Sequence, residues 1–358
     1  MLSRRRLLLT LAALAAPASR AAISYPPVVP RTLTFPQDFG AHADFRTEWW
    51  YLTGWLGDRR RPLGFQLTFF RSRTDVDPAN PSAFAAHQLV IAHAAIADPA
   101  RGSLLLDERI ARTGFGLAET ANGDTDVRLS GWSLRRDSAT DTYHAQIAAR
   151  EFTLGFRAVA NAPPWLQGDQ GISRKGPDPL QASYYYSRPQ LKVQAQLSRS
   201  GKMQELGGIA WLDHEWSSAA LAPDAVGWDW VGMNLDDGSA LAAFQIRSKK
   251  AGQPPVQTYA ALRGASGSVQ IVAPDEVSFT PLRYWKSSRH RTAWPVAQRI
   301  RIGTREFETR PLMDDQELDS SLTTGAVYWE GASELLEAGR PVGRGYLEMT
   351  GYVAPLQL

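Results

Sequence analysis

The feature that most constrains the fold of this chain is a side-chain pattern of period two that recurs along most of its length. Residues 63–70, 126–135 and 240–247 alternate apolar and polar side chains, as half-buried strands do. Residues 88–97 are apolar nearly throughout and predict a strand covered on both faces. Helical periodicity is scarce, and only short pieces such as residues 333–338 suit a turn or two of helix. Many short strands separated by turn signals predict an all-β sandwich or barrel.

Turn residues fall between the expected strands. Residues 228–235 and 240–247 flank Asp236-Asp237-Gly238-Ser239, which predicts a hairpin because glycine accepts a positive φ. Residues 143–159 are long enough for two strands or for one bent strand. Residues 161–179 are rich in glycine and proline, so we expect a long ordered loop there, one that could act as a lid.

The N-terminus has the pattern of an export signal. Arginines 4–6 directly precede an apolar run, as in twin-arginine signals, and that run is too short to span a bilayer. Small residues at Ser19 and Ala21 predict cleavage after Ala21, with Ala16-Pro17-Ala18 as the competing site. An uncleaved membrane anchor is the alternative. We expect a periplasmic or secreted protein whose mature chain does not span a membrane.

Removal of this segment changes what the charge implies. The whole chain has a formal net charge of +3, and four arginines leave with residues 1–21, so the mature chain is near −1. No basic run remains, and we therefore predict no nucleic-acid partner. The remaining length of about 337 residues exceeds what one core usually serves, which predicts two domains, 22–217 and 218–358. Cysteine is absent, so stability must come from buried area, which the 12 Trp, 11 Tyr and 13 Phe can supply.

Three short stretches place acids among large aromatic side chains. They are Glu48-Trp49-Trp50-Tyr51, residues 207–216, and Gly227-Trp228-Asp229-Trp230. Charged groups rarely stay beside large apolar ones unless they are paired, hydrogen-bonded or used. If the second stretch is extended, its side chains alternate between two faces, with Trp211, Asp213 and Glu215 on one and Leu212, His214 and Trp216 on the other.

An acid held against indole rings has a definite chemical use. Poor solvation raises its pKa and keeps a proton available near neutral pH. Such an acid can protonate an alkene, an ether or an enol, while the indole faces stabilise the developing cation. A neighbouring histidine could position the acid or activate water. The alternative is structural: Asp213, Glu215 and Glu48 would then close buried salt bridges or accept hydrogen bonds from backbone amides.

Other common chemistries lack their motifs. The sequence has no glycine-rich phosphate loop, no G-x-S-x-G elbow and no HExxH, and it has no thiol. His87 and His93 would share a strand face, but we interpret both as packed or surface residues. A zinc site that combines His214 with Asp213 or Glu215 is disfavoured because neighbours on a strand point in opposite directions. We predict no metal and no cofactor.

The same stretches resemble a known family. Residues 47–54, 171–187, 208–216 and 227–230 are together similar to the AttH-like lipocalin family, which includes carotenoid 1,2-hydratase (hydroxyneurosporene synthase) and kievitone hydratase. The resemblance spans most of the mature chain. It implies two lipocalin-like, calycin-type antiparallel β-barrels packed together, the first ending near Trp216, and an apolar ligand site.

The resemblance also implies site residues. In the family hydratases a histidine and a tryptophan two residues later help to line the site, matched here by His214 and Trp216. Those hydratases also use a Tyr-x-Asp on a following strand to protonate a double bond. Our best placement of that strand is residues 243–247, where Phe244 and Ile246 stand instead. The acid would then be Asp213, Glu215, Asp229 or Glu48. The residues that we expect to bind the ligand are Glu48, Trp49, Trp50, Tyr51, Gln66, Tyr185, Trp216, Trp228, Trp230 and Phe244.

Two functions follow from these expectations. The first is a cofactor-free lyase or isomerase that protonates or hydrates a lipophilic substrate such as a terpenoid, lipid or polyketide, with Asp213 or Glu215 as the acid and His214 orienting it. The second is a non-catalytic periplasmic carrier that passes a hydrophobic metabolite to a transporter, since AttH-type members are often associated with ABC transporters. The missing Tyr-x-Asp favours the carrier, and the dense Asp-His-Glu cluster favours the enzyme. A hydrolase is a weaker third, because no serine nucleophile is visible beside a base.

Overall fold

The computed structural model describes residues 23–219 and 221–356, so the expected export segment 1–21 lies outside it. Their regular secondary structure consists of strands and two short 3-10 helices, η1 (Gln37–Phe39) and η2 (Pro274–Glu276). Within the described ranges, no helix has the length and apolar character that a bilayer crossing needs. The all-β class predicted from the period-two pattern is confirmed.

The first thirteen strands form one antiparallel sheet, in the order β4-β3-β2-β1-β13-β12-β9-β8-β7-β6-β5, with β10 and β11 paired to β12. Their bounds are β1 Thr47–Leu56, β2 Leu63–Arg73, β3 Gln88–Asp98, β4 Ser103–Arg112, β5 Ala118–Thr120, β6 Asp126–Leu129, β7 Trp132–Asp137, β8 Thr142–Ala148, β9 Phe152–Val159, β10 Trp165–Leu166, β11 Ile172–Arg174, β12 Ala182–Arg199 and β13 Lys202–Ser217.

The remaining ten strands form a second antiparallel sheet, in the order β17-β16-β15-β14-β23-β22-β20-β19-β18, with β21 paired to β22. Their bounds are β14 Ala225–Leu235, β15 Ala240–Ser248, β16 Gln257–Arg263, β17 Val269–Val272, β18 Val277–Lys286, β19 Ala293–Ile302, β20 Arg305–Pro311, β21 Glu317–Ser320, β22 Ala326–Glu337 and β23 Arg340–Met349. The chain passes from one sheet to the other between Ser217 and Ala225.

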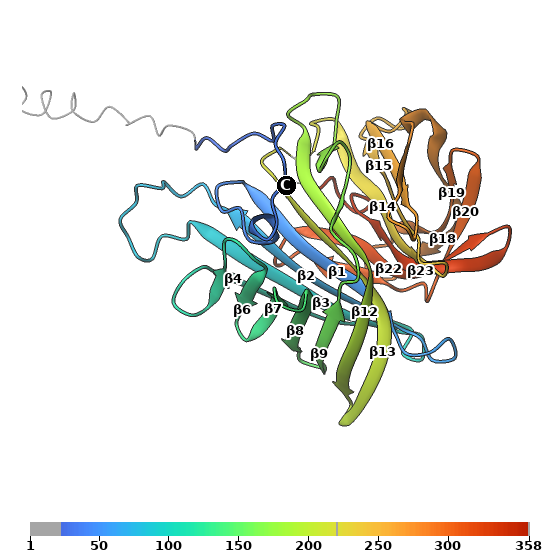
Figure 1. Ribbon diagram of the computed structural model, residues 1–358, viewed down its shortest axis with the longest axis horizontal. Helices are drawn as coiled ribbons and strands as arrows, with labels where there is room; N and C mark the ends of the chain where they lie inside the picture. Colours follow the sequence, from blue (N-terminus) through green and yellow to red (C-terminus); the bar gives the residue numbers. More distant parts are fainter. Residues whose placement is uncertain (1–22, 220, 357–358) are drawn as a thin grey trace, which may run out of the picture.

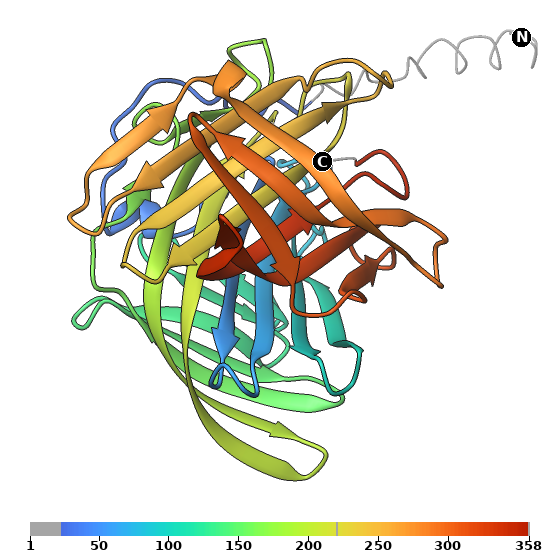
Figure 2. The ribbon, with the colours of Figure 1, turned by 90° about the vertical axis from the view of Figure 1, so that its right-hand side faces the viewer.

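Both sheets curl, and they pack against each other (Figure 1). The N-terminal sheet nearly completes a barrel, and the C-terminal sheet is a half-barrel whose edges, β17 and β18, stay apart in the pairing order. Figure 2, seen from the side of the C-terminal sheet, shows that sheet lying over the strands of the N-terminal sheet. Contacts between the two run chiefly from β1 and β2 to β22 and β23, and from β12 and β13 to β14.

Three groups of buried apolar side chains stabilise this arrangement. One fills the N-terminal sheet around Trp50, Leu212 and Trp216. Another fills the C-terminal sheet around Val231 and Trp294. The third lies between the sheets and is largely aromatic, with Tyr51, Trp55, Trp165, Trp211, Trp230, Phe244 and Tyr346. Burying so much aromatic surface is how a chain without disulfides acquires its stability.

Two local expectations need correction, and one is resolved. Residues 333–338 are not helical, because Ser333 to Glu337 continue β22 and pair with β20 and β23; tertiary pairing overrides the helix propensity of the Glu-Leu-Leu-Glu run. The expected loop at 161–179 contains two short strands, β10 and β11, that pair with β12. Residues 143–159 form two strands, β8 and β9, rather than one bent strand.

Candidate functional site

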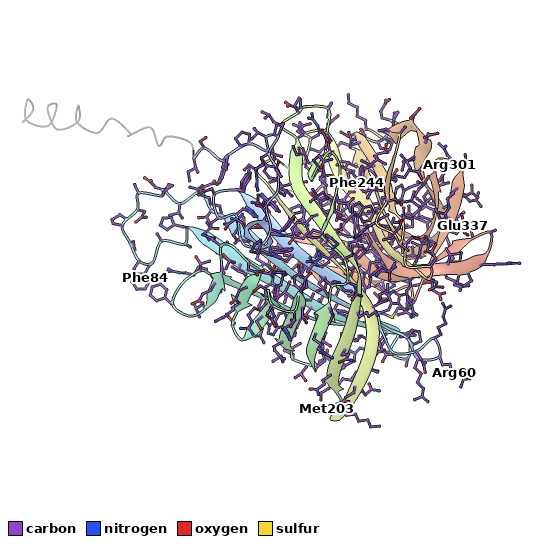
Figure 3. The ribbon with its side chains drawn as sticks, in the orientation of Figure 1. Arg60, Phe84, Met203, Phe244, Arg301 and Glu337 are labelled. Carbon is purple, nitrogen blue, oxygen red and sulfur yellow. The ribbon has the colours of Figure 1, made fainter. Side chains whose placement is uncertain are left out.

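The two sheets enclose a cavity of about 540 Å³. One wall is the outer face of β1, β2, β3, β12 and β13, and the other comes from β14, β15, β22 and β23. Six of the predicted ligand-binding residues line it: Trp49, Tyr51, Tyr185, Trp228, Trp230 and Phe244. Figure 3 labels Phe244 among the side chains between the sheets, whereas Phe84 lies on an outer loop and Met203 at the outer end of β13. The volume lies within the range of small-molecule sites.

Strand β13 divides its functional side chains between two environments. Asp213 and Glu215 face the cavity. Trp211, on the same face, packs in the aromatic group between the sheets. Leu212 and Trp216 point the other way, into the core of the N-terminal sheet, and His214 stacks there on Trp50 with ring centroids 4.6 Å apart. Alternation along the strand therefore separates His214 from both neighbouring acids.

Asp213 is buried within a shell of donors. Its Oδ1 accepts hydrogen bonds from Trp211 Nε1 at 2.7 Å and Ser187 Oγ at 2.5 Å, and its Oδ2 accepts one from Tyr185 Oη at 2.7 Å. Burial raises the pKa of Asp213 to about 7, and these three bonds counteract only part of that rise. Near neutral pH the carboxyl is therefore poised between its two protonation states.

Glu215 is compensated by a residue from the glycine- and proline-rich segment. Lys175 Nζ lies 2.8 Å from Glu215 Oε1, and Ser183 Oγ donates to the same oxygen. The Lys175 ammonium also lies over the rings of Tyr185 and Phe244, at 5.1 and 4.4 Å from their centroids. Lys175 therefore forms an ion pair with this acid and packs against the aromatic wall.

Two further acids lie opposite each other on neighbouring strands of the C-terminal sheet. Glu330 on β22 and Glu348 on β23 are direct cross-strand partners, and both line the cavity. Glu330 Oε2 accepts a hydrogen bond from Tyr51 Oη at 2.8 Å, and Glu348 Oε1 accepts one from Trp228 Nε1 at 3.0 Å. Among the described residues, neither forms a salt bridge. Burial raises the pKa of both carboxyls, and the nearby Glu348 raises that of Glu330 further.

The acid and histidine on the inner side of the N-terminal sheet form a different arrangement. Glu48 Oε2 accepts a hydrogen bond from Arg71 Nε at 2.8 Å, and Glu48 Oε1 lies 2.9 Å from His214 Nε2 and 2.8 Å from His42 Nδ1. Burial opposes ionisation of Glu48, but the bonds from His214 and His42 and the charge of Arg71 outweigh it and hold its pKa well below the usual range. Burial lowers the pKa of His214.

Three atoms of this inner group converge as metal ligands do, since His42 Nδ1, Glu48 Oε1 and His214 Nε2 lie within 4.8 Å of one another. The donors present nevertheless account for the geometry without an ion. Both histidine nitrogens approach one oxygen at hydrogen-bond distance, and Arg71 already neutralises the carboxylate. His42 Nε2 is 2.9 Å from Asp38 Oδ1, and His214 Nδ1 is 3.0 Å from Tyr186 Oη. We interpret the group as an ion-pair network that ties η1 to the barrel, in which Arg71 Nη2 is buried without a hydrogen-bond partner among the described residues.

The structure disperses the remaining predicted residues. Glu48, Trp50 and Trp216 lie in the interior of the N-terminal sheet with His214, away from the cavity. Asp229 is buried on the inner side of the C-terminal sheet, where Gln245 and Tyr352 donate hydrogen bonds to it at 2.7 and 3.0 Å. Gln66 lies between the sheets, and its amide donates to Thr68 Oγ1, which lines the cavity.

The cavity is also lined by four residues that were not predicted from the sequence, namely Lys175, Tyr328, Glu330 and Glu348. One signal was available, because Tyr328-Trp329-Glu330 and Tyr346-Leu347-Glu348 repeat the pattern of acids beside aromatic residues. Both segments also place a tyrosine and an acid two residues apart on one strand face, the residue kinds that the family resemblance led us to seek at residues 243–247. No local signal showed that these strands would face Asp213.

Comparisons with known proteins agree with this architecture. The model of a family described as AttH-like matches residues 26–352. A crystal structure described as an AttH protein from Nitrosomonas europaea is 52% identical, covers 91% of this chain and 99% of its own, and superimposes with a TM-score of 0.85. Among curated proteins, no sequence matches this chain.

Two more distant structures share the fold. Kievitone hydratase from Nectria haematococca is 14% identical, with a TM-score of 0.68 over 91% of this chain and 98% of its own. CghA, solved with Sch210972, is 13% identical, with a TM-score of 0.59 over 94% of this chain and 96% of its own. These two likenesses concern the fold, two curled β-sheets packed together. The family match, which spans nearly all the described residues, shows that this chain belongs to the AttH-like family.

Proposed function

We propose that the cavity between the sheets binds a lipophilic small molecule and adds a proton to it, so that a double bond is hydrated or isomerised. The observation that carries this proposal is the Glu330–Glu348 pair, two facing carboxyl groups without a cationic partner among the described residues, in a pocket walled by aromatic side chains. Two carboxyls so close in a poorly solvated site do not both ionise, so at least one holds a proton near neutral pH.

The wall chemistry suits such a reaction. Trp49, Trp228 and Trp230 offer apolar surface for a lipophile, and their electron-rich faces stabilise positive charge. The acid transfers its proton to one alkene carbon as the π bond breaks, which leaves a carbocation on the other carbon. Water then forms the C–O bond and releases one proton, or a neighbouring carbon loses a proton and the double bond shifts. Hydration therefore consumes one water molecule and regenerates the acid overall.

The Glu330–Glu348 pair is a better donor than the acids expected from the sequence. Glu215 is compensated by Lys175, and Asp213 already accepts three hydrogen bonds from the protein. Each member of the pair has one side-chain donor, Tyr51 or Trp228. We therefore assign the role of proton donor to the Glu330–Glu348 pair. Asp213 has an electrostatic role, because its negative charge would stabilise a carbocation.

The test begins with whatever lipophile accompanies the protein from its own cells, identified by native mass spectrometry and extraction. The extracted compound is incubated with fresh protein in water enriched in oxygen-18. Hydration adds the mass of one labelled water molecule, and isomerisation changes retention time without changing mass. We expect Glu330→Gln and Glu348→Gln each to slow the conversion by about 10²- to 10⁴-fold, the usual contribution of a positioned acid.

Asp229→Asn is the matched control, because Asp229 is a buried acid whose burial also raises its pKa but which lies outside the cavity wall. It should leave the rate unchanged. A bound lipophile that returns unaltered from the unmodified protein would reject catalysis and leave the second candidate, a carrier. The donors that already saturate Asp213 favour that candidate, since a carrier needs a stable polar wall rather than a reactive acid.

A further inference from the structure

A chain of hydrogen bonds connects the cavity to the molecular surface across the boundary between the two sheets. It begins at Tyr328 on β22, which lines the cavity, and its second member is His93 on β3 of the opposite sheet. Thr323, in the turn before β22, and Glu108 on β4 complete it. Figure 1 shows that β3 and β22 belong to different sheets, so the chain exists only where the sheets meet.

The contacts give the hydrogen-bond chain a direction. Thr323 Oγ1 donates to Glu108 Oε2 at 2.6 Å, so its oxygen is free to accept the N–H of His93 Nε2, which lies 3.0 Å away. With its proton on Nε2, His93 presents a bare Nδ1, and this nitrogen accepts the hydrogen bond of Tyr328 Oη. Every donor therefore points outward from the cavity, from phenol to imidazole to hydroxyl to carboxylate.

The hydrogen-bond chain runs from the protein interior to the solvent. His93 is completely buried and packs on Phe70, with ring centroids 5.2 Å apart. Burial lowers its pKa to about 3, so it is neutral at physiological pH and can both donate and accept. The Glu108 side chain is 17% exposed and therefore reaches solvent. The buried phenol is thereby linked to water through groups that can each pass on a proton.

We propose that Tyr328 is a second acid–base group of the cavity and that His93, Thr323 and Glu108 are positioning residues that exchange its proton with solvent. The proposal rests on the proposed function, because a lipophile that fills the cavity excludes the water that would otherwise carry protons. The cavity acid supplies one proton in hydration, and the attacking water must lose another. The chain provides a route for that second proton.

The transfer balances as follows. Water adds to the carbocation, and the resulting oxonium gives one proton to the Tyr328 oxygen as the phenolic proton moves to His93 Nδ1. The Nε2 proton of His93 moves to Thr323, whose own proton moves to Glu108 and then to solvent. The cavity acid regains a proton when the alcohol leaves and water enters. One C–H and one C–O bond form, and one π bond and one O–H bond break.

The experiment uses 2-naphthol, a lipophilic phenol that becomes a strong acid on excitation, as a probe in the whole protein. If the chain accepts its proton, the bound probe emits as naphtholate; in a dry site without an acceptor it emits as naphthol. We expect naphtholate emission from the unmodified protein. In Thr323→Val and in Glu108→Gln the naphtholate-to-naphthol ratio should fall by about tenfold, the rate change that accompanies a barrier higher by roughly one hydrogen bond.

Thr324→Val is the matched control. Thr324 also lines the cavity, but its hydroxyl contacts Ser320 within its own turn and lies outside the chain. Its ratio should equal that of the unmodified protein. The proposal is overturned if the unmodified protein gives only naphthol emission, or if Thr323→Val and Thr324→Val behave alike. A purely structural clasp between the sheets would change melting temperature in these variants and leave the emission ratio alone.

A ligand-free measurement decides the matter if the probe does not bind. Nitrogen-15 histidine spectra should show His93 as the neutral tautomer with its proton on Nε2 from pH 5 to pH 8, and the opposite tautomer or a titration in that range would overturn the relay. Failure of the proposed function is separable from failure of this inference. Proton transfer to the chain without any turnover of lipophile would reject the first alone, and turnover that survives Thr323→Val would reject the second alone.

Discussion

The two faces of the N-terminal sheet, where β1 and β13 pair, carry buried acids of opposite electrostatic character. On the inner face, Glu48 is met by Arg71, His42 and His214, and its pKa is depressed. On the outer face, the donors that Asp213 meets among residues 23–219 and 221–356 are all neutral, and its pKa is raised. Burial alone therefore does not decide the protonation state of a carboxyl. The partners decide it, and alternation along neighbouring strands presents different partners on the two faces of the sheet.

The difference separates a stabilising network from a reactive site. A carboxylate paired with a guanidinium and two imidazoles holds its geometry but has no proton to give near neutral pH. Uncompensated acids cost stability when they ionise, and they are retained where a proton or a charge is used. We therefore regard the inner group as a structural clamp and the outer group as the candidate chemical site, although both share the acid-and-aromatic pattern in the sequence.

The largest expected effect comes from breaking the inner network. Arg71→Leu removes the guanidinium that donates to Glu48 and Gln88, and it leaves Glu48 buried with only the histidines as partners. We expect the free energy of unfolding to fall by about 3–5 kcal/mol, as is usual when one partner of a buried ion pair is removed. Urea unfolding at pH 7 measures this loss.

Arg310→Leu is the reference variant, because its partner Glu334 lies on the surface and the pair is largely exposed. Removing an exposed pair should cost at most about 1 kcal/mol. Equal losses in the two variants would mean that Glu48 takes up a proton or finds water when Arg71 is absent. The buried charge of Glu48 on the inner face would then be no better compensated than that of the acids on the outer face.

The next effect is the pH dependence contributed by Asp213. Its pKa in the folded protein, about 7, lies above the unfolded value. The folded state therefore binds more protons between about pH 4 and pH 7, so stability falls as pH rises through that window. Between pH 5 and pH 7 we expect Asp213 to account for a loss of about 2 kcal/mol. Asp213→Asn should lack this loss when both proteins are unfolded by urea across that range.

An acid associated with the inner network should show the opposite sign. Burial opposes ionisation of Asp38, but hydrogen bonds from His42, Arg31 and the Thr34 amide outweigh it and hold its pKa below the usual range. Its contribution is present above the unfolded pKa and is lost as pH falls. Asp38→Asn should therefore flatten the acid side of the stability curve. The comparison of the two faces fails if Asp213→Asn also changes stability on the acid side of the curve and leaves stability between pH 5 and pH 7 unchanged.

Period-two alternation was enough to predict the all-β class, whereas the two packed barrels were implied by the family resemblance. Alternation marks most strands and the separation of Asp213 from His214 on β13, and turn residues mark the hairpin at residues 236–239. Hydrophobic pattern specifies such elements because each strand must bury one face. It failed at residues 333–338, where Glu-Leu-Leu-Glu favours a helix in isolation and pairing with two neighbouring strands decides otherwise.

The composition of the cavity could not be predicted in the same way. Alternation shows that Asp213 and Glu215 share a face, but not whether that face meets solvent, the barrel interior or the second sheet. Glu330 and Glu348 come more than 100 residues later and reach the cavity only because β22 and β23 pack against β1 and β2. The converse holds for Trp50 and Trp216. Both are next to cavity-lining residues in the sequence, but their side chains lie on the other side of the sheet.

The smallest expected effect concerns a single hydrogen bond in the cavity. Trp228→Phe keeps an aromatic ring but removes the indole N–H that donates to Glu348. That bond favours the ionised carboxyl, so its loss raises the pKa of Glu348 further above the usual range. At pH 8 we expect a loss of stability of about 1 kcal/mol, and at pH 5, where the carboxyl is protonated, a smaller one. A Trp49→Phe variant, which alters an indole on the facing wall of the same cavity, corrects for the change in packing, and the difference between the two variants should therefore shrink as pH falls. A difference independent of pH would show that Glu348 is already ionised in the folded protein, and the proton of the facing pair would then belong to Glu330 alone.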